Sequence, residues 1–213
     1  MKHPKFITTL YLLAFILFLS NCVVPYESAR MLPKGAMELK GSYTHASERF
    51  EGESASINDG LGFGFGYGVT DRINVKLRYE RLFLSDSDGE GLNYIAFGPK
   101  FALIPDKLAV IFPFGAYTYD GESTWGVHPN LMATFPGKNN KFEATVGART
   151  DIFFEEGADM LIGLNLGLGI SQDLDRWAVR PDFGLVFNPG EDGVLLTFGV
   201  GFSYNIIPGG GNR

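Results

Sequence analysis

The sequence has little of several residue types that carry chemistry in other proteins. Its 213 residues include one cysteine, three histidines and two tryptophans. The single cysteine, Cys22, excludes a disulfide within the chain and a zinc–thiolate cluster. After about the first twenty residues, no apolar run approaches the length that a transmembrane helix needs.

Motifs for catalysis and nucleotide binding are also missing. The chain contains neither G-x-S-x-G nor H-E-x-x-H. GFGFG, at residues 62–66, is followed by more strand pattern and a turn, whereas a dinucleotide fingerprint needs a helix there. The net charge is −6 and no basic cluster is present, so we expect no nucleic-acid partner. We also expect no cofactor and no metal centre.

Glycine and aromatic residues are plentiful instead. The chain has 28 glycines and 14% aromatic residues, a composition typical of β-rich proteins. Residues 60–68 read GLGFGFGYG, with a glycine at every second position. In a strand, this period places Leu61, Phe63, Phe65 and Tyr67 on one face and all the glycines on the other. The pattern predicts a barrel strand with lipid outside and a crowded lumen inside.

The N-terminus has the features of a signal peptide. Lys2 and Lys5 precede a mostly apolar run, residues 6–19, which is too short to span a bilayer as a helix. The run ends in LSNC, residues 19–22, which resembles the lipobox of bacterial lipoproteins, although Asn21 stands where Gly, Ala or Ser is usual. This resemblance implies lipidation of Cys22. The alternative is an ordinary signal peptide with Cys22 as a spectator.

From residue 36 onward, apolar and polar residues alternate in segments of barrel-strand length. The expected strands are 36–46, 59–70, 73–83, 92–103, 107–119, 124–135, 141–153, 161–171, 176–187 and 194–206. The fold class is therefore all-β, a transmembrane antiparallel up-and-down β-barrel of about ten strands, with eight strands as the alternative. The expected organisation is a signal peptide (1–21), a periplasmic linker (22–35), the barrel (36–206) and a flexible tail (207–213).

The connections between these strands predict an orientation. Tight turns at 70–72, 105–106, 136–140 and 172–175 alternate with connections that are mostly longer. In outer-membrane barrels the short side is periplasmic, which puts both ends of the barrel in the periplasm of a bacterial outer membrane. The barrel region resembles small outer-membrane barrels of the OmpA or OmpW kind, in architecture only. Residues 196–206 resemble the terminal strand through which such proteins are recognised, which implies the barrel-assembly machinery as a partner.

Four prolines interrupt the expected strands. A proline cannot donate to a strand ladder, and a closed barrel has no edge strand for it. Pairing the hairpins about their tight turns places Pro99, Pro113 and Pro129 at similar height on adjacent strands, while Pro181 stands apart. We expect the three prolines to form one shared line of β-bulges.

Charged residues at alternating positions are expected to face the lumen. Because buried charges must be paired or solvated, they predict a lumen crossed by ion pairs. The members of this network are Glu38, Lys40, Lys76, Arg78, Glu80, Lys100, Glu143, Arg149, Asp151, Arg180 and Asp182. The glycines at 62, 64 and 66 should lie beside these side chains and leave space for them.

The connections on the longer side are strongly acidic. Their acidic residues are Glu48, Glu51, Glu53, Asp59, Asp86, Asp88, Glu90, Asp120, Glu122, Glu155, Glu156, Asp159, Glu191 and Asp192, and Arg49 is the one basic residue among them. A solvated rim is one interpretation. The other is binding of divalent cations, free or bridging to outer-membrane lipid.

These features leave three functional hypotheses. The leading one is a non-enzymatic outer-membrane barrel with an envelope-structural or surface-interaction role. The second is a narrow channel for small solutes or ions. The third is a rim hydrolase, resembling the barrel enzymes of outer membranes, with His128 as a base oriented by Asp151, Asp182 or Glu143. His45 falls on the lipid-facing side of its strand, so it is a poor candidate.

Overall fold

The structure is a computed structural model that describes residues 25–50, 53–84, 91–155, 157–190 and 193–207. Cys22, the signal peptide and most of the C-terminal tail lie outside the described residues. Among the described residues, no helix is long and apolar enough to cross a membrane.

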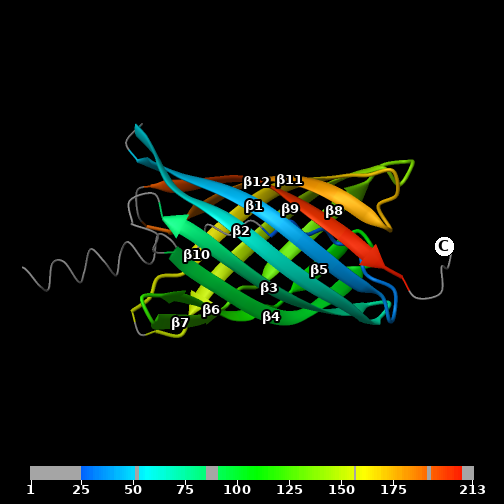
Figure 1. Ribbon diagram of the computed structural model, residues 1–213, viewed down its shortest axis with the longest axis horizontal. Helices are drawn as coiled ribbons and strands as arrows, with labels where there is room; N and C mark the ends of the chain where they lie inside the picture. The colour runs from blue at the N-terminus through cyan, green and yellow to red at the C-terminus, as the bar shows by residue number, and fades with distance from the viewer. Residues whose placement is uncertain (1–24, 51–52, 85–90, 156, 191–192, 208–213) are drawn as a thin grey trace, which may run out of the picture.

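All regular elements of the described residues are strands (Figure 1). Their bounds are β1 (Met37–Phe50), β2 (Glu53–Thr70), β3 (Ile73–Leu84), β4 (Gly91–Ile104), β5 (Leu108–Ile111), β6 (Phe114–Tyr119), β7 (Glu122–Val127), β8 (Asn130–Pro136), β9 (Phe142–Phe153), β10 (Leu161–Ile170), β11 (Trp177–Phe187) and β12 (Val194–Ile206). Each strand pairs antiparallel with its neighbours, and β12 pairs with β1, which closes the sheet into a barrel.

The barrel has ten wall strands, which confirms the expected count. β5 and β6 form one wall strand because both pair with β4, and β7 and β8 form another because both pair with β9. Met37 pairs with Ile206, so both ends of the barrel lie at one rim. The four tight turns lie at this rim too, on the right in Figure 1, and the other connections lie at the opposite rim. We call these the tight-turn end and the loop end.

The three aligned prolines interrupt the ladder where expected, but they do not form bulges. The pairing register of β4 with β5 and β6 is the same on both sides of the gap, and so is that of β9 with β7 and β8. Each proline carbonyl instead accepts a backbone hydrogen bond from the next wall strand: Pro99 from Phe112 (2.9 Å), Pro113 from His128 (2.9 Å) and Pro129 from Thr150 (3.0 Å). The prolines therefore remove N–H donors from the ladder, but neither strand gains the extra residue that defines a β-bulge.

The two faces of the wall differ as the period-two pattern predicts. On β3, Leu77 and Tyr79 point outward and are each 42% exposed, whereas Lys76 and Glu80 point inward and are buried. The same alternation around the barrel leaves a continuous outer face of large apolar side chains, such as Phe63, which is 53% exposed. An apolar outer belt of this kind suits a lipid environment.

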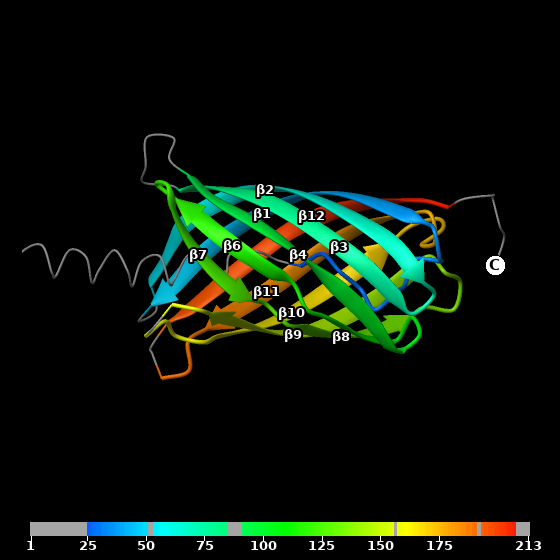
Figure 2. The same cartoon turned by 90° about the horizontal axis from the view of Figure 1, so that it is seen from below.

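The segment expected as a periplasmic linker is irregular as predicted, but it lies inside the barrel. Residues 25–33, which we call the plug segment, run inside the lumen from mid-barrel to the tight-turn end (Figures 1 and 2). Tyr26 reaches the middle of β1, where its hydroxyl donates to the Tyr43 carbonyl (2.7 Å). Met31 lies at the tight turn that contains Asp106, whose carboxylate accepts from the Met31 amide (3.0 Å).

Candidate functional site in the barrel lumen

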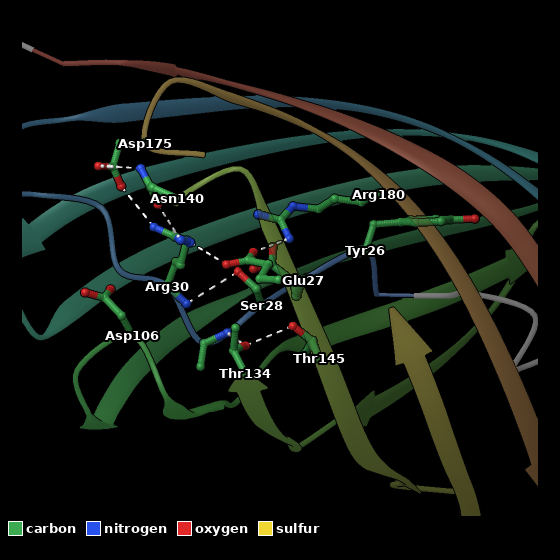
Figure 3. Close-up of polar contacts among 12 residues, drawn as sticks. Tyr26, Glu27, Ser28, Arg30, Asp106, Thr134, Asn140, Thr145, Asp175 and Arg180 are labelled. Atoms are coloured by element: carbon green, nitrogen blue, oxygen red, sulfur yellow. Dashed lines mark hydrogen bonds and ion pairs between the residues drawn. The ribbon is translucent and has the colours of Figure 1, made fainter. Parts of the chain in front are cut away.

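The plug segment is held by polar contacts to several wall strands. The Ala29 amide donates to the Thr134 hydroxyl on β8 (2.7 Å), and that hydroxyl lies 2.9 Å from the hydroxyl of Thr145 on β9 (Figure 3). On the other side, the Gly68 main chain lies so close to Pro33 that an added Cβ would be 2.1 Å from the Pro33 carbonyl oxygen. Because its backbone groups find partners on the wall, an irregular segment can remain inside a lumen without the cost of unpaired polar groups.

Glu27 of the plug segment meets three lysines of the wall. Its carboxylate forms an ion pair with Lys40 on β1, lies 3.4 Å from the ammonium of Lys76 on β3, and lies 3.2 Å from that of Lys100 on β4. Glu38 also pairs with Lys76, and its carboxylate lies 3.4 Å from the Lys40 ammonium. The side chain of Lys100 is 1% exposed, so its charge depends on these partners.

Arg30 fixes the plug segment close to the tight-turn end. Its guanidinium pairs with Glu143 on β9, donates to the Asn140 side chain (2.7 Å) and lies 3.0 Å from the Asp175 carboxylate (Figure 3). Arg180 on β11 donates to the other oxygen of Glu143 (2.7 Å). One carboxylate therefore joins an arginine of the wall to an arginine of the plug segment.

A third polar group lies at mid-barrel around Tyr26. The Tyr26 hydroxyl is 2.8 Å from the Thr44 hydroxyl, which donates to Glu80 (2.9 Å). Arg78 donates to the same Glu80 carboxylate (3.1 Å), and its guanidinium lies 5.7 Å from the centroid of the Tyr26 ring. The mid-barrel end of the plug segment, at Tyr26, is thus part of a hydrogen-bonded chain with residues of β1 and β3.

His128 lies in the lumen at the proline gap between β7 and β8, and it pairs with Asp151. Its Nδ1 is 2.8 Å from Asp151 Oδ1, and it is only 2% exposed. The rings of Tyr94, Tyr117 and Phe153 surround it with centroid distances of 5.5 to 6.0 Å. His128 also lines a small cavity at mid-barrel.

Toward the loop end the lumen is filled by an apolar layer. Its side chains come from strands around the whole wall and pack against one another. They are Ala46, Leu82, Leu84, Leu92, Tyr94, Ala96, Tyr117, Phe153, Leu161, Val186 and Leu195. The lumen is therefore occupied at two levels, by the plug segment at the tight-turn end and by this layer above it.

Cavities remain beside the plug segment, and two of them adjoin the charged groups described above. One, of about 80 Å³, lies at mid-barrel and is lined by Tyr26, Lys40, Arg78, Tyr94 and His128 among others. The other, of about 570 Å³, lies at the tight-turn end. We call it the vestibule, and it is lined by charged and polar residues that include Glu27, Lys76, Lys100, Asn140 and Asp175.

The structure places the residues of the expected ion network as follows. All eleven point into the lumen, in separate groups rather than one network. Glu38, Lys40, Lys76 and Lys100 surround Glu27; Glu143 and Arg180 join Arg30; Arg78 pairs with Glu80; Arg149 lies 3.5 Å from Asp151. Asp182 accepts from the Asn165 side chain (3.3 Å) and is not in a direct ion pair within 4.0 Å in the described part of the chain.

Sequence reasoning missed Glu27 and Arg30, the two charged residues of the plug segment, each of which lies at the centre of one of these groups. Both lie in a proline-flanked segment without periodicity, so nothing local marked them as lumen residues. One signal was available. Lys40, Lys76 and Lys100 lie on β1, β3 and β4, and Glu38 is the one carboxylate of the described wall strands that pairs with them, so further negative charge was needed from elsewhere.

The acidic rim is described only in part. Asp120, Glu122, Glu155 and Asp159 are exposed at the loop end, and Asp59 accepts from Tyr43 (2.7 Å) and pairs with His45 (2.9 Å) on the outer face. Asp86, Asp88, Glu90, Glu156, Glu191, Asp192 and Glu51 lie outside the described residues. Within the described ranges, no group of three or more acidic, histidine or cysteine side chains is arranged to hold a metal ion.

Fold and lumen together define a transmembrane β-barrel with a filled bore. No protein-family model matches the chain. No curated protein matches it in sequence either. Among solved structures, an outer-membrane channel from Pseudomonas putida F1 is 12% identical, with a TM-score of 0.50 over 86% of this chain and 100% of that one. Ail, the attachment invasion locus protein of Yersinia pestis, is 12% identical, with a TM-score of 0.39 over 81% of this chain and 99% of that one. At this identity the likeness to the channel shows a shared fold.

Proposed function

We propose that this protein is a bacterial outer-membrane barrel with its tight-turn end in the periplasm. A closed sheet of ten strands has no unpaired edge, and its outer face carries an apolar belt. The longest connection, residues 154–160 between β9 and β10, lies at the loop end, as long loops do on the outer side of such barrels, while two-residue connections occur at both ends. Outer-membrane lipid and the barrel-assembly machinery are its expected partners.

Within this location, the structure best supports a narrow channel for small solutes that is closed by its own N-terminal segment. The observation that carries this proposal is the plug segment itself. Eight strands enclose a lumen that side chains can fill, so ten strands leave a wider bore. Here the tight-turn half of the bore is closed by a polar segment whose hydrogen bonds and ion pairs can be exchanged for water. The channel of Pseudomonas putida F1 has the same fold, which is consistent with this role.

Conductance across planar bilayers tests the channel. The wild-type protein should be closed for most of the time. Arg30→Ala removes the contacts to Glu143, Asn140 and Asp175. A hydrogen bond to a charged group contributes about 1.5–3 kcal/mol, and Glu143 keeps Arg180 as a partner, so we expect about a tenfold higher open probability. Arg176→Ala is the matched control because Arg176 is exposed at the same end and lies 3.8 Å from Asp173. Equal traces for both variants would contradict a gating role for the plug segment.

The second candidate is a non-enzymatic envelope-structural or surface-interaction role. The apolar layer favours it, because this layer occupies the lumen independently of the plug segment. A chain that stays silent in bilayers even as Arg30→Ala would support this role. Its contacts would then run through the loop end, where acidic residues such as Glu122 and Asp159 are exposed and divalent cations are possible partners.

A further inference from the structure

We propose that Lys40, Lys76 and Lys100 form a binding site for a small oxyanion, a solute that carries a carboxylate or phosphate group. Glu27 occupies this site as an internal substitute for the solute. This inference rests on the proposed function, since the solute reaches the site through the lumen. It adds the chemical class of solute, which the fold alone does not indicate.

The first argument is the convergence of positive charge on one carboxylate. Three ammonium groups, from β1, β3 and β4, surround the two oxygens of Glu27. Without Glu27, these three lysines face a single wall carboxylate, that of Glu38, so the wall alone carries an excess of two positive charges here. Buried ammonium groups need anionic partners, so the wall itself calls for an anion at this place.

The second argument is the shape of the wall between the lysines. β2 lies between β1 and β3, and it presents Gly64 opposite Lys40 and Gly66 opposite both Lys76 and Glu38. A Cβ on Gly66 would lie 3.1 Å from the Lys76 ammonium and 3.2 Å from the Glu38 carboxylate. Glycine at these positions leaves room for an oxyanion and for the lysine stems that reach it.

The third argument is access. The vestibule, about 570 Å³ in volume, is lined by Glu27 and all three lysines at the tight-turn end. A solute with one carboxylate or phosphate group fits within this volume and reaches the ammonium groups before it meets the apolar layer. Lys100 also donates to the carbonyls of Ser28 (2.6 Å) and Arg30 (2.8 Å), so an anion that attracts Lys100 weakens the hold on the plug segment.

Titration of the purified full-length chain with sodium phosphate, and separately with sodium acetate, tests the site at constant ionic strength. A site filled by an internal competitor binds its ligand more weakly in proportion to the occupied fraction. Glu27→Gln should therefore bind at least one probe about tenfold more tightly than the wild type does. Adding Lys100→Gln to Glu27→Gln should remove this gain. The difference between the two probes shows whether the site prefers phosphate or carboxylate.

Asp151→Asn is the matched control, because it removes a buried lumen carboxylate that contacts His128 and Arg149 and leaves Glu27, Arg30 and the lysines in place. We expect it to bind within about threefold of the wild type. No saturable binding of either probe to Glu27→Gln would overturn the site, as would a gain that survives Lys100→Gln. An equal gain in Asp151→Asn would overturn the role of Glu27 as a substitute ligand.

A measurement on the wild type covers the case in which Glu27→Gln does not fold. The Ala29 and Met31 amides donate to Thr134 and Asp106, so their hydrogen exchange reports release of the plug segment. Phosphate or acetate should accelerate this exchange saturably, and sodium chloride at the same ionic strength should not. Equal exchange in all three salts would overturn the site. If Glu27→Gln binds a probe but Arg30→Ala shows no conductance, the channel is refuted and the site stands. If Arg30→Ala conducts but no probe binds, the site is refuted and the channel stands.

Discussion

Single residues decide how much space the lumen has for its charged side chains. On β2 this space is left by glycines, which have no side chain of their own. Gly62, Gly64 and Gly66 face Glu80, Arg78 and Lys76 across the β2–β3 pair, as the hairpin register predicts. An added Cβ at Gly66 would press on the Lys76–Glu38 pair, whereas at Gly41 of β1, which faces outward, it would meet nothing within 4 Å. A side chain added to a glycine is therefore crowded on the lumen face of the wall and unobstructed on the lipid face.

We predict that Gly66→Leu destabilises the barrel far more than Gly41→Leu does. Overpacking costs about 1–3 kcal/mol, and the displaced Lys76–Glu38 pair adds to that cost. Gly41→Leu adds an apolar side chain to the lipid face and should be nearly neutral. Reversible urea unfolding in lipid vesicles measures both variants. Gly64→Leu should resemble Gly66→Leu, and Phe65→Leu on the lipid face should be milder; equal unfolding midpoints would refute this view of the glycines.

The residues of the lumen were predictable from sequence only where they belong to strands. The period-two pattern placed Lys76, Glu80 and Arg180 inside because each alternates with an apolar neighbour. Glu27 and Arg30 lie outside any period-two run, and their positions depend on tertiary contacts with Lys100 and Glu143 that no local pattern records. Counting the positive and negative lumen residues at each height of the wall would have indicated that Glu27 and Arg30 were needed there.

At the scale of elements, the line of prolines keeps the strands in register while it removes ladder bonds. Hairpin pairing predicted the height of Pro99, Pro113 and Pro129 correctly, because the short connections at 105–107 and 120–121 set the register. The predicted local geometry, a line of β-bulges, was wrong. A strand can accommodate a missing N–H either with a bulge or with a gap in the ladder without an inserted residue, and the structure has the gap. Close approach of the backbones marks the gap: a Cβ on Gly98 would lie 2.1 Å from the Phe112 carbonyl oxygen and 2.7 Å from Pro113 Cα.

We predict that Gly98→Ala destabilises the barrel by about 1–3 kcal/mol, because backbone atoms of the facing strand must move. Gly163→Ala on β10 is the control. Its Cβ would meet Val186 at 3.5 Å, which is ordinary contact, so the loss of chain entropy in the unfolded state should make it neutral or stabilising by up to about 1 kcal/mol. Urea unfolding with a fluorescence readout compares the two. A Gly98→Ala variant as stable as the wild type would show that the gap is loosely packed.

At the scale of the whole molecule, the lumen has two different halves. The tight-turn half is charged, contains the plug segment and opens into the vestibule. The loop half is filled by the apolar layer and ends in exposed acidic residues. An anion that binds the lysines therefore arrives from the tight-turn side, and the compartment on that side determines which solutes the protein can meet.

The orientation of the barrel can be measured with two single-cysteine additions, which we expect to react on opposite sides of the membrane. Glu122→Cys lies exposed at the loop end and Lys138→Cys lies exposed in a tight turn. If the tight turns are periplasmic, a membrane-impermeant maleimide labels Glu122→Cys in intact cells and labels Lys138→Cys only after the outer membrane is permeabilised. The wild-type chain serves as the blank for Cys22. The reverse pattern would place the vestibule outside the cell, and the lysine site would then sample external anions rather than periplasmic ones.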